Sequence, residues 1–388
     1  MMSVSNLMAG RPEAVAGVEL GLELYPAGEW DRVAEKWERL LASAPRPSFF
    51  LSRRWVETWM EVFGPRLETS IAVLEYRDTP VAACLLVQSR RKYGLVPLRR
   101  ISLNASGENP EDTTYVEFND LVCLPGWEEP VVSRLAEHLS AEQWDEFSLD
   151  GFLPGRAYDA VKRAFARFDL EETRQPSYYV DLAALRRMDL TYDGMLNSHR
   201  RRMVRQNIRA FSKLGPLILE VAQTTEAAIQ MLGELALLNR ERFARDGGHS
   251  AFESAAFLEF HRKLIQKRQA NGGVQLLRLK AGGNTIGIVY NLVSAGKVCF
   301  YQCGFNYGLN PKLSPGIATL AQAIPYCLNQ GYDDFDFLSG EANYKRMLST
   351  GSRELVWAVF RRRSAAIRSM TAARTAKRHL QRLLRSSK

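Results

Sequence analysis

Apolar residues in the first quarter of the chain recur at helical spacing and then alternate with polar ones. A stripe with steps of three or four residues runs from Trp30 to Leu41 and predicts an amphipathic helix. A second helix follows, with Ser52 as its N-cap and Gly64 just past its end. In "TSIAVLEYRDTPVAACLLVQ", apolar and polar positions alternate on both sides of Arg77–Pro80, which predicts a β-hairpin.

The same order of elements returns in the second half of the chain. The first half continues with "VEFNDLVCL" as a strand, "EEPVVSRLAEHLS" as a helix and "WDEFSLDGF" as a strand. In the second half, two helices within 224–270 precede a hairpin that turns at Gly282–Asn284, the strand "KVCFYQCGF", the helix "SPGIATLAQAIPYCLNQG" and the strand "YDDFDFLSG". Because both halves end on a helix and an acidic, aromatic strand, we interpret them as two copies of one α/β unit of about 150 residues.

Length and charge divide the chain into four parts. We expect a loose leader over 1–20, a first lobe over 21–175, a second lobe over 176–360 and a basic tail over 361–388. The formal net charge is +9, but the tail holds ten Lys or Arg residues and no Asp or Glu. The body therefore has 42 basic and 43 acidic side chains, and it lacks the basic excess of a nucleic-acid-binding domain. The tail pattern predicts a basic amphipathic helix for an anionic membrane or RNA, with a solvated tail as the alternative.

Targeting and membrane-spanning signals are missing from the sequence. No segment near the N-terminus joins a basic region to an apolar core, and "VAACLLV", the longest apolar run, is too short to span a bilayer. We therefore expect a cytoplasmic protein, soluble or peripheral on the inner face of the cytoplasmic membrane. The five cysteines match no common zinc spacing, so we expect reduced, mostly buried thiols and no metal site.

The run "HRRRMVRQNIRAF" at 199–211 is strongly basic. At helical spacing it separates an apolar stripe from a basic one. The apolar stripe consists of Val204, Ile208 and Phe211, and the basic stripe of Arg201, Arg205 and Arg209. Like charges one turn apart repel, so an anionic partner would stabilise the helix; a solvated charged face is the alternative. His199, at the helix start, is a candidate base or simply a polar cap.

The helix that begins in "KLSPGIATL" is suited to hold a phosphate. Ser314 is a good N-cap, a proline fits the first turn, and Gly316 lets a ligand approach the backbone. Free N–H groups without a nearby acid favour an anion, and Lys312 adds a positive charge. An ordinary capped helix is the alternative. The matching helix of the first half begins with Glu128 and Glu129, which would repel a phosphate.

The run "DFDFLSGEANYKRM" gathers charges at the end of a strand. By alternation, Asp334 and Asp336 lie on one side of this strand and two phenylalanines on the other. The loop beyond it contains Glu341, Tyr344, Lys345 and Arg346. This is either a functional site or a strand-end turn with solvated charges and a structural tyrosine.

Together these motifs resemble the CelD/BioF2-like acyltransferase branch of the GNAT superfamily, which is related to the FemAB peptidyltransferases. The resemblance covers about 30–360 and rests on "FLSRRWVETWMEVFG", "HRRRMVRQNIRAF", "FARDGGHSAF", "LSPGIATLAQAI" and above all "FDFLSGEANYKRM". Asn343 stands where the family pattern has proline. The resemblance implies an α/β (α+β) fold of two tandem GNAT lobes, each a mixed, mostly antiparallel sheet flanked by helices. The second lobe would bind the acyl donor and catalyse transfer, and the first would be non-catalytic.

The resemblance also implies a chemistry and roles for the site residues. The donor would be acyl-CoA, a co-substrate rather than a tightly bound cofactor, and the acceptor an amine or hydroxyl. Attack on a thioester needs a base and an acid, for which the candidates are Glu341 or Asp336 and Tyr344. The donor phosphates would rest on the helix start at Lys312, Ser314 and Gly316, with further contacts from Lys345, Arg346 and Arg205.

Several functions remain open at the level of sequence. We favour N-acylation of a lipid amine, such as a sphingoid base in bacterial ceramide synthesis, or of another cell-envelope amine, because the basic tail suits a membrane-resident acceptor. The alternatives are acylation of an exopolysaccharide, associated with cellulose, and FemAB-like transfer from aminoacyl-tRNA. We rank transfer of groups other than aminoacyl groups first, since 224–270 leaves no room for an added helical hairpin. A non-catalytic nucleic-acid-binding protein ranks last.

Overall fold

The computed structural model describes residues 19–44, 47–93, 96–267, 273–310, 312–364 and 367, and it divides the chain into two compact units. Unit 1 takes the described residues up to Asn109 together with Thr114–Arg174 and those from Val356 onward. Unit 2 takes Pro110–Thr113 and Gln175–Leu355. Nearly all of the predicted leader and most of the predicted basic tail lie outside the described residues.

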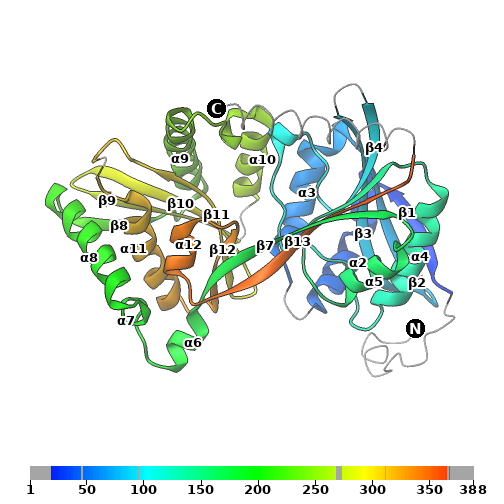
Figure 1. Cartoon of the computed structure of the whole chain (residues 1–388), viewed down its shortest axis with the longest axis horizontal. Coiled ribbons are helices and arrows are strands. Elements are labelled where there is room, and N and C mark those ends of the chain that lie inside the picture. The colour runs from blue at the N-terminus through cyan, green and yellow to red at the C-terminus, as the bar shows by residue number, and fades with distance from the viewer. Residues whose placement is uncertain are drawn as a thin grey trace, which may run out of the picture. The chain divides into compact units, whose positions relative to one another are not determined.

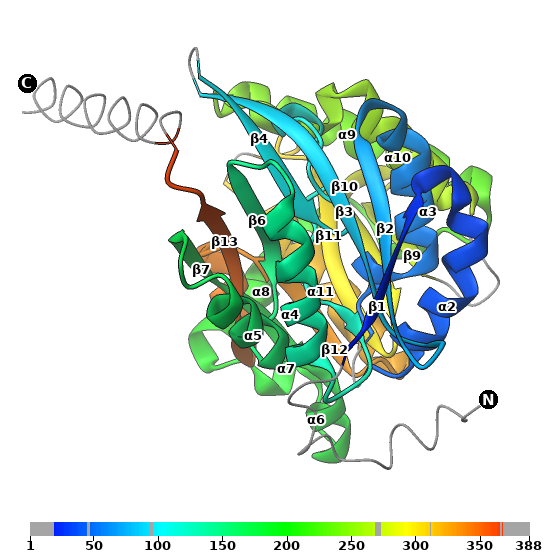
Figure 2. The same ribbon diagram turned by 90° about the vertical axis from the view of Figure 1, so that its right-hand side faces the viewer.

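Unit 1 is a mixed sheet with helices on both faces. Its strands are β1 (Gly21–Pro26), β2 (Glu68–Tyr76), β3 (Thr79–Tyr93), β4 (Val96–Leu103), β5 (Val122–Cys123), β6 (Glu146–Phe152) and β13 (Gly351–Arg361). Its helices are α2 (Trp30–Ala42), α3 (Arg53–Val62), α4 (Glu128–Ala141) and α5 (Arg156–Ala164). The strand order is β1-β2-β3-β4-β6-β13; only β4 and β6 run parallel, and β5 pairs with β3. Figure 2 shows α2 and α3 on one face and α4 and α5 on the other.

Unit 2 repeats this plan. Its strands are β7 (Asp169–Asp181), β8 (Leu217–Val221), β9 (Val274–Ala281), β10 (Asn284–Ser294), β11 (Lys297–Phe305) and β12 (Asp334–Ser339). Its helices are α6 (Leu182–Arg187), α7 (Tyr192–Met195), α8 (Ser198–Phe211), α9 (Thr225–Arg245), α10 (Ala255–Gln266), α11 (Pro315–Asn329) and α12 (Asn343–Leu348). The order is β7-β12-β11-β10-β9-β8, and only β11 and β12 run parallel. Helices α9 and α10 cover one face, and α8, α11 and α12 cover the other (Figure 1).

Both units also contain short 3₁₀ turns. They are η1 (Ala27–Glu29), η2 (Phe49–Leu51), η3 (Gly64–Arg66), η4 (Pro110–Asp112), η5 (Ser212–Leu214) and η6 (Ala251–Glu253). Among the described helices, none is both long and apolar enough to cross a membrane.

The sixth strand of each unit comes from the other half of the chain. In unit 1, Val356–Arg361 of β13 pairs antiparallel with β6. In unit 2, the end of β7 pairs antiparallel with β12. The expected second lobe, 176–360, is therefore corrected at its C-terminal end, because β13 begins in unit 2 and completes the sheet of unit 1.

Local sequence explains why predicted helices form and why one predicted strand does not. The predicted helices at Trp30 and Ser52 are confirmed, and the Ser52 hydroxyl accepts a hydrogen bond from the Trp55 N–H as an N-cap. The predicted strand "VEFNDLVCL" was wrong over most of its length, since only Val122–Cys123 is a strand. Positive φ at Phe118, 52°, is incompatible with extended backbone and turns the chain there. The described cysteines are free, with Cys84, Cys299 and Cys327 buried.

A buried carboxylate joins the exchanged strand to unit 1. Glu146 on β6 is 0% exposed, and it accepts hydrogen bonds from Arg100 on β4 at 2.6 Å and from Arg361 on β13 at 2.8 Å. A buried charge is tolerated only when it is paired and hydrogen-bonded, so this triad fixes β13 against β6.

Replacing Glu146 with Gln should lower the free energy of unfolding by about 3 kcal/mol, because the nearly buried guanidinium of Arg100 loses its counter-charge and that of Arg361 keeps only the exposed Glu171. Urea unfolding followed by tryptophan fluorescence measures the change. The control is Glu137→Gln, an exposed residue whose ion pair with Arg134 lies on the surface of α4. An equal effect of the two substitutions would contradict this account of β13.

Candidate functional site

The start of α11 is held by α8 rather than by its own cap. Ser314 occupies the N-cap position, but its hydroxyl makes no capping hydrogen bond, which corrects the expected capping role. Its backbone N–H instead donates to Asn207 Oδ1 at 2.7 Å. The first turn contains Pro315 and no acid, so the helix dipole at this end is not neutralised by a local carboxylate.

Gly316 is explained by packing against β11. A Cβ at this position would lie 2.9 Å from the ring of Phe305, closer than real contacts allow. The absence of a side chain therefore seats Phe305 against the first turn of α11, a reason that the sequence did not reveal. Lys312 is exposed just ahead of this turn, and its backbone N–H donates to Asn310 Oδ1 at 2.9 Å.

Strands β11 and β12 part beside this helix start. Their parallel pairing covers only Lys297–Cys299 against Asp334–Asp336. Just beyond Cys299, the register of β11 against β10 shifts between Tyr290 and Asn291, so Tyr301 is left over as a bulge. A bulge bends its strand, and here it coincides with the point at which β11 leaves β12. Beyond these residues, the C-terminal ends of β11 and β12 do not pair with each other.

A group of polar and aromatic side chains lies at these parted ends. Tyr344 on α12 is half-buried with its ring edge-on to Phe337 of β12, the ring centroids 6.3 Å apart. Burial, with help from the Cys303 thiol, raises the pKa of Tyr344, while Arg242 at the end of α9 opposes the rise. Burial likewise raises the pKa of Cys303 to about 11. Tyr307 belongs to the same group, since it perturbs the pKa of Tyr344 as well.

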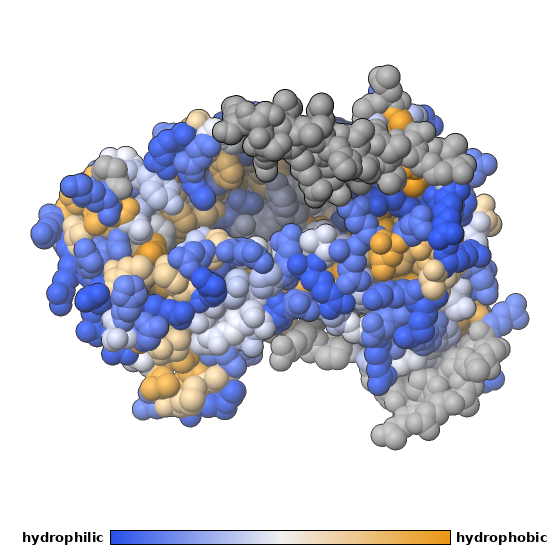
Figure 3. Space-filling view, viewed as in Figure 1, coloured by the Kyte–Doolittle hydropathy of each residue, from blue (hydrophilic) through white to orange (hydrophobic). Residues whose placement is uncertain are grey.

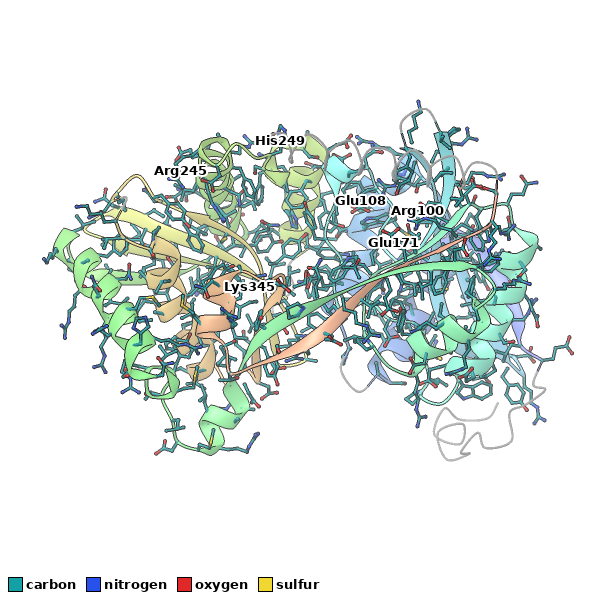
Figure 4. All side chains as sticks on the ribbon, in the orientation of Figure 1. Arg100, Glu108, Glu171, Arg245, His249 and Lys345 are labelled. Atoms are coloured by element: carbon teal, nitrogen blue, oxygen red, sulfur yellow. The ribbon has the colours of Figure 1, made fainter. Side chains whose placement is uncertain are left out.

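The group has a cationic border on α9. Arg242 lies 3.7 Å from Asp246 through its Nε, and Arg245 stacks over the ring of Tyr307 at 4.7 Å from its centroid. Figure 4 shows Arg245 on α9 and Lys345 near α12. Sequence reasoning missed Arg242, Cys303 and Tyr307. The resemblance did include "FARDGGHSAF", which begins one residue after Arg242, but the pattern gave no reason to place the end of α9 near Tyr344.

Lys345 is engaged by the backbone of its own loop. Its ammonium donates to the carbonyl oxygens of Leu338, at 3.1 Å, and of Ser339. Leu338 and Gly340 have positive φ of 60° and 117°, so the chain turns sharply here and exposes these carbonyls to the lysine. Lys345 therefore fixes the loop that presents Tyr344, and its charge is already partly satisfied by the protein.

Asp336 is placed inside the sheet. It is 0% exposed; its Oδ1 accepts from the Ser177 hydroxyl at 2.6 Å and from the Leu338 N–H at 2.8 Å. Its Oδ2 lies 3.4 Å from Lys297 Nζ and 3.6 Å from Arg353 Nε. These contacts make Asp336 a structural link among four strands. The predicted alternation is confirmed, because Phe335 and Phe337 are buried in the core on the opposite side.

The remaining predicted site residues do not converge on Tyr344 in the described contacts. Glu341 is exposed between β12 and α12, and Arg346 is exposed with a 3.4 Å contact to Asn343 Oδ1. His199 is exposed in the first turn of α8. Arg205 pairs with Asp193 at 2.6 Å. It lies two residues before Asn207, about 200° around the helix, so it faces away from the start of α11.

Unit 1 fills the corresponding gap with its own chain. There β4 and β6 also pair over three residues only, Arg100–Ser102 against Glu146–Ser148. Asn119 then bonds to β6 through its backbone, donating to Gly151 O at 2.9 Å and accepting from Leu153 N–H at 3.0 Å. Its side-chain amide donates to the carbonyl oxygens at Leu103 and Asp150. Asn119 thus bridges the ends of the two strands.

Comparison with known proteins identifies the domain that contains these parted strands. Residues 198–346 match the acetyltransferase (GNAT) domain. The matched segment runs from α8 into α12, so it includes the start of α11, the ends of β11 and β12, and Tyr344. The match supports an acyltransferase of GNAT type. Among curated proteins there is no significant match.

Solved structures share the fold at low identity. FemX superposes with a TM-score of 0.54 and 11% identity, covering 84% of this chain and 95% of its own. L-PGS from Bacillus licheniformis gives 0.53 and 12%, covering 89% and 96%. A C-terminal domain named for lysylphosphatidylglycerol synthetase, from Agrobacterium fabrum, gives 0.52 and 11%, covering 88% and 95%. These likenesses establish the fold alone. Among the described residues, no cluster of three or more His, Cys, Asp or Glu side chains is arranged to hold a metal ion.

Replacing Asn207 with Ala should lower the free energy of unfolding by about 1–2 kcal/mol, because the Ser314 N–H loses its buried acceptor. Urea unfolding measures the change, and Gln206→Ala, an exposed neighbour on α8, is the control. Equal stability of the two variants would show that Asn207 does not brace α11.

Proposed function

We propose that this chain is an acyl-CoA-dependent N-acyltransferase of the CelD/BioF2-like branch, with its active site in unit 2 and a lipid or cell-envelope amine as acceptor. The observation that carries the proposal is the parting of β11 from β12 between the start of α11 and Tyr344. The GNAT-domain match over the same elements supports it. The donor is a co-substrate whose thioester would lie between the parted strands.

The donor phosphates would bind at the start of α11. Several backbone N–H groups of a first helical turn have no partner within the helix, and the positive end of the helix dipole favours an anion. Lys312 lies just ahead of that turn, and no acid is present in it. Arg205 is not part of this proposed subsite, since it faces away and pairs with Asp193.

Tyr344 would act as the acid. The acceptor amine attacks the thioester carbonyl, the C–N bond forms, the C–S bond breaks, and the departing thiolate takes a proton. A raised pKa keeps the Tyr344 hydroxyl protonated at neutral pH, so it retains the proton that it must give. For the amine proton we propose Glu341 over Asp336, because Glu341 is exposed in the loop that precedes Tyr344 whereas Asp336 is enclosed by ion pairs.

Unit 1 would serve as a non-catalytic scaffold. Its strand gap is bridged by Asn119, which leaves no free ends for a thioester to bond. The first turn of its α4 contains Glu128 and Glu129, which oppose the binding of a pyrophosphate. Both obstacles are missing from the described residues of unit 2 around β11, β12 and α11.

The names of proteins that share the fold bear on the acceptor class. A sphingoid-base-like amine or another envelope amine is our first choice, and exopolysaccharide acylation is the alternative. Structures that share this fold include FemX and a domain named for lysylphosphatidylglycerol synthetase, and phosphatidylglycerol is a lipid. These neighbours favour aminoacyl transfer from tRNA as the second candidate function.

One assay separates the two candidates. The purified chain is given acyl-CoA donors of several chain lengths with sphingoid bases, other envelope amines or glycans, and release of coenzyme A is followed with product mass. We expect release that depends on a lipid amine. Transfer from aminoacyl-tRNA without release from any acyl-CoA would establish the second candidate and overturn the first.

Tyr344→Phe should lower kcat by about a hundredfold with KM for acyl-CoA nearly unchanged, because the proton donor is lost while the ring stays in place. The matched control is Tyr326→Phe, another half-buried tyrosine of unit 2, on α11. A variant with full kcat would remove Tyr344 from the mechanism.

A further inference from the structure

Helix α8 has an outer face whose charges the fold does not use. Its inner face packs through Val204, Asn207 and Phe211, which are buried. On the outer face, Arg202, Arg209 and the following Lys213 are exposed. Residues 198–213 contain no Asp or Glu.

The side chains of Arg202, Arg209 and Lys213 are available to an external partner. Arg205 is neutralised by Asp193, whereas Arg202, Arg209 and Lys213 make no hydrogen bond or ion pair within the described part of the chain. They line an open recess of about 840 Å³ that is formed along α8 and its continuation into η5. Like charges this close repel, so an extended anionic surface against them lowers the energy of the face.

Exposed apolar side chains occur in the segments of the chain before and after α8. Met188 and Leu190, in the segment that leads from α6 to α7, are 58% and 43% exposed. Leu214, which follows α8 in η5, is 44% exposed. In Figure 3, hydrophobic colour gathers over the α6 end of unit 2, at the lower left of the view, among strongly hydrophilic neighbours.

We propose that this face, defined as Arg202, Arg209 and Lys213 with Leu214, docks unit 2 onto an anionic lipid bilayer. Basic side chains gain electrostatic attraction near anionic headgroups, and an apolar side chain beside them gains by entering the interface. A nucleic acid would satisfy the cations but would leave Leu214 in water, so the combination favours a membrane. The identity of the acceptor as a lipid rests on the proposed function; the docking face itself rests on these side chains.

The test uses the full chain and sedimentation with vesicles of phosphatidylcholine alone or mixed with phosphatidylglycerol. The triple variant Arg202→Ala, Arg209→Ala and Lys213→Ala should reduce partition onto the mixed vesicles by about a hundredfold at low salt, as expected for three basic residues near the surface. The charge-matched control is Arg90→Ala, Arg156→Ala and Arg262→Ala. These exposed residues also have no partner among the described contacts. The control should bind like the unaltered chain.

A second variant tests the apolar part of the face. Leu214→Ser should weaken binding to the mixed vesicles while leaving its salt dependence unchanged. Equal loss in the basic triple variant and its control, binding that ignores phosphatidylglycerol, or RNA that displaces the protein from vesicles through the same three cations would overturn the proposal.

Transfer to a water-soluble amine separates this proposal from the proposed function. The basic triple variant should retain it, since the three residues face away from α11, and should lose activity only toward an amine embedded in the mixed vesicles. If no acceptor supports coenzyme A release, the proposed function fails while the vesicle result still decides the docking face.

Discussion

The buried carboxylate of Asp336 is the constraint on which the arrangement of unit 2 depends. It stands at the last position where β12 pairs with β11, opposite Cys299, and it contacts Ser177 of β7 and Arg353 of β13. A buried charge must keep its partners, so these strands are fixed together at one point. Just past it, the chain can turn sharply through Leu338, and the two parallel strands separate without loosening the sheet. The parting of β11 and β12 therefore begins directly after the point at which Asp336 holds the strands together.

The two units differ in whether a segment of the chain lies between the ends of their parallel strands. In unit 1 the buried carboxylate is Glu146, at the first position of the parallel pairing rather than the last, with Arg100 and Arg361 as partners. There the segment with Asn119 returns between the ends of β4 and β6. Gly151 makes this possible, since a Cβ on it would lie 2.3 Å from the Val116 carbonyl oxygen. One repeated architecture therefore has a bridged strand pair in unit 1 and a parted strand pair in unit 2, and the difference lies in the segment with Asn119.

Sequence patterns predicted most helices and strands, but they did not predict that β7 and β13 each join the sheet formed by the other half of the chain. Periodicity located α2, α3, α8 and α11 because each has one buried stripe, and alternation located β12 because Phe335 and Phe337 face the core. Strand β13 was not anticipated as a member of unit 1, since pairing between Phe360 and Phe147 joins residues more than 200 positions apart. The charged motif after β12 was found, but the pattern cannot separate Asp336, which is enclosed, from Tyr344, which faces the parted strands. That distinction depends on the turn at Leu338 and on Cys303 and Arg242, which come from distant segments.

Helix α8 connects the interior of unit 2 to its surface. Asn207 holds the start of α11 by accepting the Ser314 N–H, so any force on α8 acts directly on the helix turn proposed to bind the donor phosphates. On its other side the helix presents Arg202, Arg209 and Lys213 to solvent. The basic run that suggests a nucleic-acid arm in the sequence is therefore divided by helix geometry into a bracing face and a face of exposed cations. The same helix thus fixes the start of α11 and presents the side chains that are proposed to meet a bilayer.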